Sequence, residues 1–129
     1  MNLDLIATLE GLRRNPASRA LLYEQLFSAT LMAAVEPGSP EDAMTFFAYA
    51  ASDGVNEVPI FTTNVYSEKV PLPDEMKWVP VPGKVLWPQL LNLLQGKEVQ
   101  ASVDPATYHG IRLTHEMVLE MVSKYKQDA

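Results

Sequence analysis

The chain of 129 residues contains no cysteine, and this absence excludes disulfides, thiolate chemistry and cysteine-based zinc sites. No apolar run approaches the length of a membrane span, and an early segment containing Asp4 and Glu10 does not fit a signal peptide. Positive charge is also scarce, because ten lysines and arginines stand against sixteen aspartates and glutamates, a net charge of −6. Such a chain repels phosphate backbones. We therefore expect a cytoplasmic protein that binds neither nucleic acid nor membranes.

The residues that usually carry catalysis are few. Histidine occurs only at positions 109 and 115, and no serine has the flanking glycines of a nucleophile elbow. His115-Glu116 lacks the second histidine of the metalloprotease helix pattern. Together with His109 and Asp104, these residues have the atom types of metal ligands but no recognised spacing. We therefore expect no enzymatic activity, no metal and no cofactor.

What the chain does contain is typical of one globular domain spanning residues 1–129. Apolar residues make up 47% of the chain and charged residues 20%, enough for a single core at this length. Leucines at helical spacing predict a first helix over residues 3–14. Asn15-Pro16 is typical of a helix start, and predicts a second helix that runs to about Ser28. The two form an N-terminal helical pair.

Six short apolar runs, bounded by proline, glycine or capping residues, predict strands. They span residues 30–36, 44–50, 58–62, 78–81, 98–103 and 111–113. The first three follow one another through short loops, which predicts an antiparallel meander. The order strand, helix, strand predicts that the fourth and fifth strands pair in parallel.

Two further helices complete the predicted fold. A leucine-rich helix over residues 83–95 contains Pro88, so it either begins near Trp87 or is kinked. Thr114 is a suitable cap for a last, amphipathic helix, while residues 64–76 allow at most one helical turn. The sequence thus predicts an α/β (α+β) domain with a mixed β-sheet of about five or six strands. The N-terminal helical pair and the C-terminal helix pack on this sheet.

Several motifs follow one another in a distinctive order. They are Val58-Pro-Ile-Phe-Thr-Thr63, Val81-Pro-Gly83 before the leucine-rich helix, Asp104-Pro105, Gly110-x-x-Leu113 and a glutamate-bearing last helix. From about Leu9 to Val122 this order resembles the N-terminal domain of the SseB family, the bacterial enhanced-serine-sensitivity proteins. That family typically has Asn-Pro where this chain has Asp104-Pro105. The resemblance implies a bacterial domain with no established enzymatic activity.

The segment from Trp78 to Trp87 is the first candidate site. Pro80 and Pro82 cannot donate ladder hydrogen bonds, which favours a strand at or near the edge of the sheet. Burial in the core is the default for both tryptophans. Large aromatic side chains beside prolines are also typical of partner-binding grooves. We therefore favour a non-catalytic protein-interaction domain that uses Trp78, Pro80, Pro82 and Trp87. Its partner is an unidentified protein or a second copy of the chain.

An alternative is a small-ligand binder or cryptic enzyme. Its site would be a rim formed by Thr62, Thr63, Asp104, His109 and Arg112, because hydroxyl and charged groups follow two of the predicted strands. The two threonines have a simpler interpretation, since threonine hydroxyls often cap the following turn by accepting from backbone amides. An enclosed polar pocket would favour the alternative, and an exposed apolar patch the interaction domain.

Overall fold

Five α-helices and six β-strands make up the part of the chain that this computed structural model describes, residues 3–11, 19–51, 53–96, 98–107 and 109–125. The helices are α1 (Leu3–Gly11), α2 (Arg19–Ser28), α3 (Asn64–Ser67), α4 (Gly83–Leu93) with its 3-10 extension η2 (Leu94–Gly96), and α5 (His115–Tyr125). The strands are β1 (Thr30–Val35), β2 (Tyr49–Ala50), β3 (Asn56–Phe61), β4 (Lys77–Pro82), β5 (Val99–Val103) and β6 (Ile111–Leu113). The predicted start of the second helix at Asn15-Pro16 lies outside the described residues.

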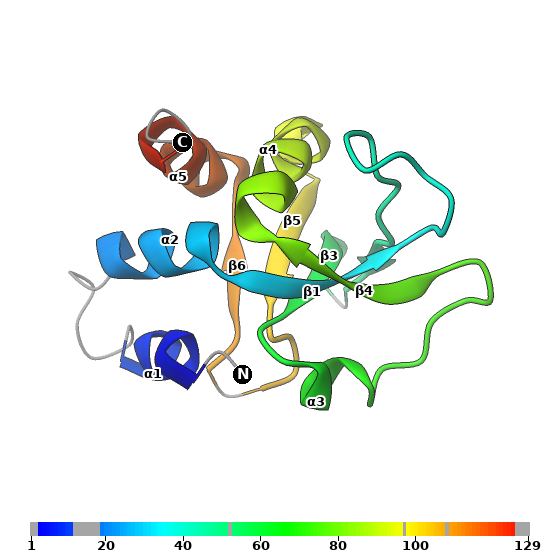
Figure 1. Cartoon of the computed structure of the whole chain (residues 1–129), viewed down its shortest axis with the longest axis horizontal. Coiled ribbons are helices and arrows are strands. Elements are labelled where there is room, and N and C mark those ends of the chain that lie inside the picture. Colours follow the sequence, from blue (N-terminus) through cyan, green and yellow to red (C-terminus); the bar gives the residue numbers. More distant parts are fainter. Residues whose placement is uncertain (1–2, 12–18, 52, 97, 108, 126–129) are drawn as a thin grey trace.

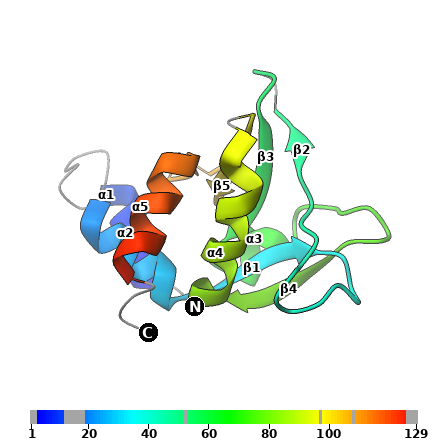
Figure 2. The ribbon, with the colours of Figure 1, turned by 90° about the horizontal axis from the view of Figure 1, so that it is seen from above.

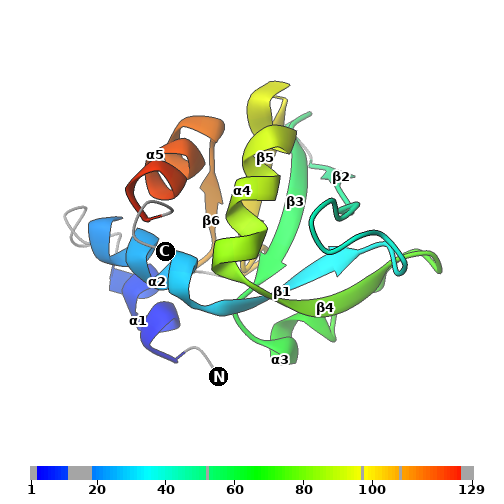
Figure 3. The ribbon, with the colours of Figure 1, turned by 45° about the horizontal axis from the view of Figure 1, so that its top comes forward.

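The strands form one mixed sheet in the order β4-β1-β3-β5-β6, with β2 paired to β3. The predicted α+β fold with a mixed sheet is therefore confirmed. The predicted pairing of the fourth and fifth strands is wrong, since β4 pairs with β1 and β5 pairs in parallel with β3. β4 and β5 do run in the same direction, but α4 carries the chain over β1 and β3, which lie between them (Figure 3).

The predicted meander is also wrong, and Pro59 provides the physical reason. β1 pairs directly with β3, but only at Met32–Phe61 and Ala33–Ile60. The bond from Asn56 N–H to Glu98 shows that even-numbered residues of β3 face β5, so the nitrogen of Pro59 faces β1. Because proline has no N–H, the ladder with β1 stops there. Phe47 N–H donates to the Ala34 carbonyl instead, so residues 45–50 fill the gap.

One face of the sheet carries the core. Side chains that alternate along the strands pack there against α1, α2, α4 and α5. Figure 3 shows α2, α4 and α5 in front of this face, and Figure 2 shows the same helices on one side of β3. The core includes Leu22, Leu26, Leu31, Ile60, Leu86, Leu90, Val103, Leu113 and Met121. Burial of these side chains against the sheet is the main favourable term in folding.

The close packing of α4 on α2 depends on Gly83 and Trp87. A Cβ at Gly83 would lie 2.1 Å from the Leu26 carbonyl oxygen, so only glycine lets α4 begin this close to the end of α2. The same oxygen accepts a 2.9 Å hydrogen bond from Trp87 Nε1. α4 begins at Gly83 and continues through Pro88, so the alternative start near Trp87 is wrong.

The other face of the sheet is covered by short segments. α3 lies on this side, below the sheet in Figure 1, and its start is fixed by Thr63, whose hydroxyl accepts from Val65 N–H. Phe61 packs edge-on against Trp78 at a ring-centroid distance of 5.2 Å. Trp78 Nε1 in turn donates to the Val70 carbonyl, which holds the loop after α3 over the sheet.

Candidate functional site

Three residues of the predicted ligand rim form one buried group, the Asp104 cluster of Thr62, Asp104 and His109. Thr62 donates from its backbone N–H to Asp104 Oδ1 at 2.8 Å and from its hydroxyl to Asp104 Oδ2 at 2.7 Å. His109 Nε2 lies 2.7 Å from the same Oδ2. The side chains of Asp104 and His109 are 0% and 2% exposed. The cluster therefore joins the ends of β3 and β5 from the inside and does not form a rim.

The cluster also fixes the loop of residues 104–110. Asp104 N–H donates to the Ile60 carbonyl, while the Asp104 carbonyl accepts from the Thr107 hydroxyl. Asp104 lies in the left-handed region at φ 51°, which aspartate and asparagine tolerate better than most residues. A Cβ at Gly110 would lie 2.4 Å from the Asp104 oxygen, so the returning chain passes close enough to require glycine.

The order of the three groups does not suit nucleophilic catalysis. In a hydroxyl–imidazole–carboxylate triad, the imidazole lies between the hydroxyl and the acid and removes the hydroxyl proton. Here the carboxylate lies between, because Asp104 Oδ2 contacts both the Thr62 hydroxyl and His109. Tyr66 covers the imidazole, with ring centroids 5.8 Å apart. The arrangement holds two strand ends together.

Arg112 lies apart from this cluster, on the second face of the sheet. Its Nε donates to Glu57 Oε1 at 2.5 Å, and its terminal nitrogens donate to Asp53 at 2.5 and 3.3 Å. The Tyr49 hydroxyl donates to the other oxygen of Glu57 at 2.5 Å. The network ties the β2–β3 hairpin to β6 across β5. The predicted rim therefore divides into two separate groups.

Burial and pairing shift the pKa values of this network. Burial, followed by the hydrogen bond to Glu57, raises the pKa of Tyr49 well above its ordinary value. The hydrogen bonds from Arg112 lower the pKa of Asp53, and the two carboxylates raise the pKa of Arg112. Both carboxylate contacts of the arginine thus favour the charged forms of Asp53 and Arg112.

A polar cavity of about 270 Å³ lies beside this network. We call it the Glu57 cavity, and its polar lining consists of Tyr49, Glu57, Ser102, Thr107 and Arg112. Glu57 and Ser102 are buried, with 7% and 4% of their surface exposed. Residues 105–107 of the loop after Asp104 also line it, and the Thr107 hydroxyl donates to the Asp104 carbonyl.

The predicted edge strand is confirmed, since β4 is the last strand on its side of the sheet. Gly83 N–H donates to the Ala29 carbonyl, so the neighbouring Pro82 nitrogen points away from β1, as does that of Pro80 two residues earlier. In an antiparallel strand every second residue faces the free edge. Trp78 is therefore the one residue of β4 that presents an N–H there. The edge has three outward carbonyls but almost no donors.

A groove of about 320 Å³ runs between this edge and the loop of residues 36–44. We call it the β4 groove. Its apolar lining consists of Val35, Pro37, Met44, Val79, Pro80, Val81, Pro82 and Val85, and its charged lining of Glu36 and Glu41. Val79, Val85 and Met44 are half-buried, whereas the prolines and both glutamates are exposed. Pro80 and Pro82 of the predicted interaction surface thus line a concave apolar site.

Gln89 of α4 fixes the outer wall of the β4 groove. Its Oε1 accepts from Met44 N–H at 2.8 Å, and its Nε2 donates to the Glu41 carbonyl at 2.8 Å. Within the loop, Ser39 donates from its hydroxyl to Glu36 and accepts from Thr45 N–H. The second half of the loop is therefore bonded to α4, and Glu36 N–H, which donates to the Thr45 carbonyl, joins its two ends.

The two tryptophans do not form one surface. Trp87 is fully buried in the core, so its prediction as an interaction residue is corrected by its bond to Leu26 and its 0% exposure. Trp78 is half-buried on the second face of the sheet, against Phe61. It lies outside the lining of the β4 groove. Of the predicted surface, Pro80 and Pro82 remain as the groove-lining part.

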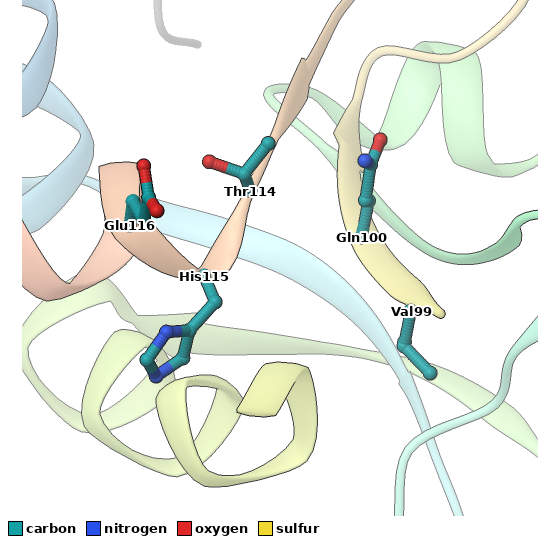
Figure 4. Close-up of a pocket in the computed structure, with 5 residues that line it drawn as sticks. All are labelled: Val99, Gln100, Thr114, His115 and Glu116. Carbon is teal, nitrogen blue, oxygen red and sulfur yellow. The ribbon is translucent and has the colours of Figure 1, made fainter. Parts of the chain in front are cut away.

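A further cavity of about 310 Å³ lies where β6 ends and α5 begins (Figure 4). Val99 and Gln100 form one wall, and Thr114, His115 and Glu116 the other. Thr114 caps α5 as predicted, because its hydroxyl accepts from Met117 N–H. Figure 4 shows that His115 and Glu116 point apart. Within the described residues, no group of three histidine, aspartate or glutamate side chains is placed to hold a metal ion.

Comparison with known proteins supports the resemblance seen in the motifs. The family described as SseB protein N-terminal domain matches residues 4–120. The chain belongs to this family. A search of curated proteins and a search of solved structures each found no match. Among the described residues, no helix is long and apolar enough to cross a membrane.

In this SseB-family domain, two features of the sites could not be read from the sequence. The β4 groove needs the loop of residues 36–44, which is held by Gln89 from a helix 45 residues further along the chain. The Glu57 cavity needs Arg112 to reach across β5 to a residue of β3. The glutamate at position 57 was one available signal, because a carboxylate inside an apolar strand requires a partner.

Proposed function

We propose that this SseB-family chain is a non-catalytic protein-interaction domain that binds a partner through the β4 groove. The observation that carries this proposal is a concave site in which half-buried apolar side chains lie beside an exposed edge strand. Apolar surface that is concave and incompletely buried is typical of interaction sites. The bonds from Gln89 to both ends of residues 41–44 support it further, since a fixed site avoids the entropic cost of ordering a loop on binding.

The geometry of the Asp104 cluster supports the non-catalytic part of the proposal. Its carboxylate separates Thr62 from His109, and all three residues are buried. General base catalysis requires a base within hydrogen-bond reach of the group it deprotonates. Within this cluster the hydroxyl already donates to a carboxylate that stabilises the fold.

A peptide selection tests the proposal. Random peptides displayed on phage are selected on the wild-type chain and then on Val85→Trp, in which a larger side chain fills the groove. Val65→Trp is the matched control, because Val65 is 44% exposed on α3 and lies outside the groove lining. Met44→Arg blocks the groove from its other wall. Each variant is first shown to fold by circular dichroism and urea unfolding.

We expect peptides that bind the wild type and Val65→Trp but neither folded groove variant. Failure to enrich any peptide would contradict the proposal. Peptides that bind all four proteins equally would place the interaction elsewhere. Should Val85→Trp fail to fold, the comparison between Met44→Arg and Val65→Trp decides.

The Glu57 cavity favours a second candidate, a small-ligand binder. Two buried polar side chains, Glu57 and Ser102, line it together with the Arg112 guanidinium. A ligand held there would raise the melting temperature of the chain in a screen of small polar metabolites. Ser102→Val, which removes a lining hydroxyl, would abolish that shift. If no compound raises the melting temperature, or if the variant responds equally, this candidate is wrong.

A further inference from the structure

We propose that the β4 groove accepts an extended segment of another protein, in which one apolar anchor side chain is flanked by lysine or arginine. We also propose that this segment is bound through side chains and does not add a strand to the sheet. The inference rests on the proposed function and names the chemistry of the partner. Three observations support it, concerning the floor of the groove, the charge of its rim and the backbone of its edge.

The floor of the groove fits an apolar anchor. Val79 and Val81 of β4 and Val85 of α4 line it, together with Met44 at the end of the loop of residues 36–44. Val81 is buried, but the other three keep part of their surface exposed. Covering them with an aliphatic or aromatic side chain removes apolar surface from water, which is the main source of binding energy at interface centres. The anchor is therefore apolar.

The rim of the groove is acidic. Glu36 and Glu41 are its charged lining residues, and Asp42 follows directly in the loop. Within the described part of the chain, no hydrogen bond or ion pair engages the carboxylate of Glu36 or Glu41. Lys77 and Lys84 are close in sequence to the groove residues of β4 and α4, but they do not line the groove.

The charge of the whole chain acts in the same direction. Its net charge of −6 attracts a cationic segment and repels an acidic one. For the same reason, a second copy of this chain is a poorer fit than a basic segment. The charges flanking the anchor are therefore positive.

The backbone at the edge excludes regular strand addition. An added strand must both donate to and accept from the edge it joins. Pro80 and Pro82 face that edge without N–H groups, so two carbonyls of an added strand would have no donor. Unsatisfied carbonyls at a forming interface are costly. Recognition through the anchor and its charged neighbours avoids this cost.

The test uses the peptides selected on the wild-type chain, synthesised with a fluorophore. Their affinities are measured for the wild type, for Glu36→Gln/Glu41→Gln, and for Glu68→Gln/Glu98→Gln. The last is a matched control, because Glu68 and Glu98 are exposed acids outside the groove lining. Both variants lose the same charge, so the control reports the effect of net charge alone.

We expect selected peptides with lysine or arginine beside an apolar residue. The groove variant should bind them about fivefold more weakly than the control variant, as two exposed ion pairs would give. A peptide whose flanking basic residues are changed to glutamine should not distinguish the two variants. Peptides N-methylated at alternate backbone positions should bind within about twofold of the parent if only side chains are recognised.

Each contrary outcome would overturn a different part of the proposal. Peptides that bind the wild type but not Val85→Trp, and that carry no basic residue, would refute the partner chemistry while the proposed function stands. Loss of binding on N-methylation would show strand addition. A dimer in sedimentation that Val85→Trp disrupts would identify a second copy as the occupant. If no peptide is selected at all, the proposed function itself fails.

Discussion

At the scale of single residues, Asp104 is a buried carboxylate with three hydrogen-bond contacts. Its carboxylate contacts the Thr62 amide, the Thr62 hydroxyl and His109, and its exposed surface is 0%. A buried carboxylate is stable only when such partners replace water. Because these partners come from the end of β3 and from the loop before β6, one side chain couples three segments. Its role follows from burial and bonding and requires no catalytic step.

A pair of substitutions at Asp104 tests this role. Asp104→Ala should lower the free energy of unfolding by about 3 kcal/mol, because it leaves buried donors without an acceptor. Asp104→Asn should cost about 1 kcal/mol, because the amide keeps the shape and tolerates the left-handed backbone. Urea unfolding measures both, with exposed Asp74→Ala as the control. Equal losses in the alanine and asparagine variants would contradict a hydrogen-bonding role.

Tyr49 provides a pH-dependent prediction. Burial and the bond to Glu57 raise its pKa in the folded chain above the ordinary value of 10.0. The contribution of the protonated phenol to stability is therefore complete below pH 10, and it is lost as pH rises above 10 towards the folded-state pKa. The wild type should lose about 1 kcal/mol more than Tyr49→Phe between pH 10 and 11, since partial exposure reduces the full linkage effect. Urea unfolding at both pH values measures this, and parallel losses would show that the pKa is not raised.

At the scale of elements, the sequence predicts the existence of strands and helices better than their pairing. Apolar runs bounded by proline and glycine identify all six strands. The extent of β2 is wrong, because this strand is two residues long where residues 44–50 were predicted. Pairing depends on where a backbone donor faces. The nitrogen of Pro59 faces β1, so it offers no N–H to that strand. The ladder between β1 and β3 therefore stays short, and residues 45–50 lie between the two strands beyond it. Which neighbouring strand the Pro59 nitrogen faces is known only once β5 is placed beside β3.

For the candidate sites too, the sequence predicts local effects better than it predicts how residues pack. The prolines of β4 correctly predict an edge, because their effect on the ladder is local. Trp87 was predicted as part of a candidate interaction surface, but it is buried, and its indole N–H donates to the Leu26 carbonyl of α2. Thr62, Asp104 and His109 do meet, yet inside the fold. Whether a residue of a helix or strand faces the core or the solvent depends on tertiary packing. The residue types alone do not reveal that packing.

The prolines of β4 protect the sheet edge, and restoring their donors tests this. Pro80→Val/Pro82→Thr gives the edge two outward N–H groups, and threonine remains a suitable cap for α4. We expect the variant to self-associate through its edge, because an unprotected edge strand pairs with another chain. Sedimentation velocity measures this, with Pro71→Val/Pro73→Thr in the loop as the control. A variant that stays as monomeric as the control would contradict edge protection.

Among the four glycines whose surroundings the structure describes, Gly83 is predicted to tolerate a side chain least. Gly83→Ala would place a Cβ 2.1 Å from Leu26 and 2.7 Å from Phe27 carbonyl oxygens, and rigid backbone cannot yield cheaply. We expect a loss of about 3 kcal/mol in the free energy of unfolding. Gly38→Ala meets open space and should cost about 1 kcal/mol for its positive φ. If urea unfolding gives equal losses, the helices are not packed as closely as the structure shows.

At the scale of the whole molecule, the helices cover one face of the sheet and short segments cover the other. The β4 groove opens at the edge where the helical layer, the sheet and the loop of residues 36–44 meet. The Glu57 cavity lies on the second face, among β2, β3, β5 and β6. The two candidate sites are therefore lined by different residues, and a perturbation of one can be distinguished from a perturbation of the other.

The most direct test is to locate a bound peptide by NMR. Backbone and methyl chemical shifts of the isotope-labelled chain are recorded while a peptide from the selection is added. An interaction domain that uses the β4 groove should show its largest shifts at Met44, Val79 and Val85, with little change at Ser102 and Ile111. The largest shifts at Ser102 and Ile111, around the Glu57 cavity, would contradict the account.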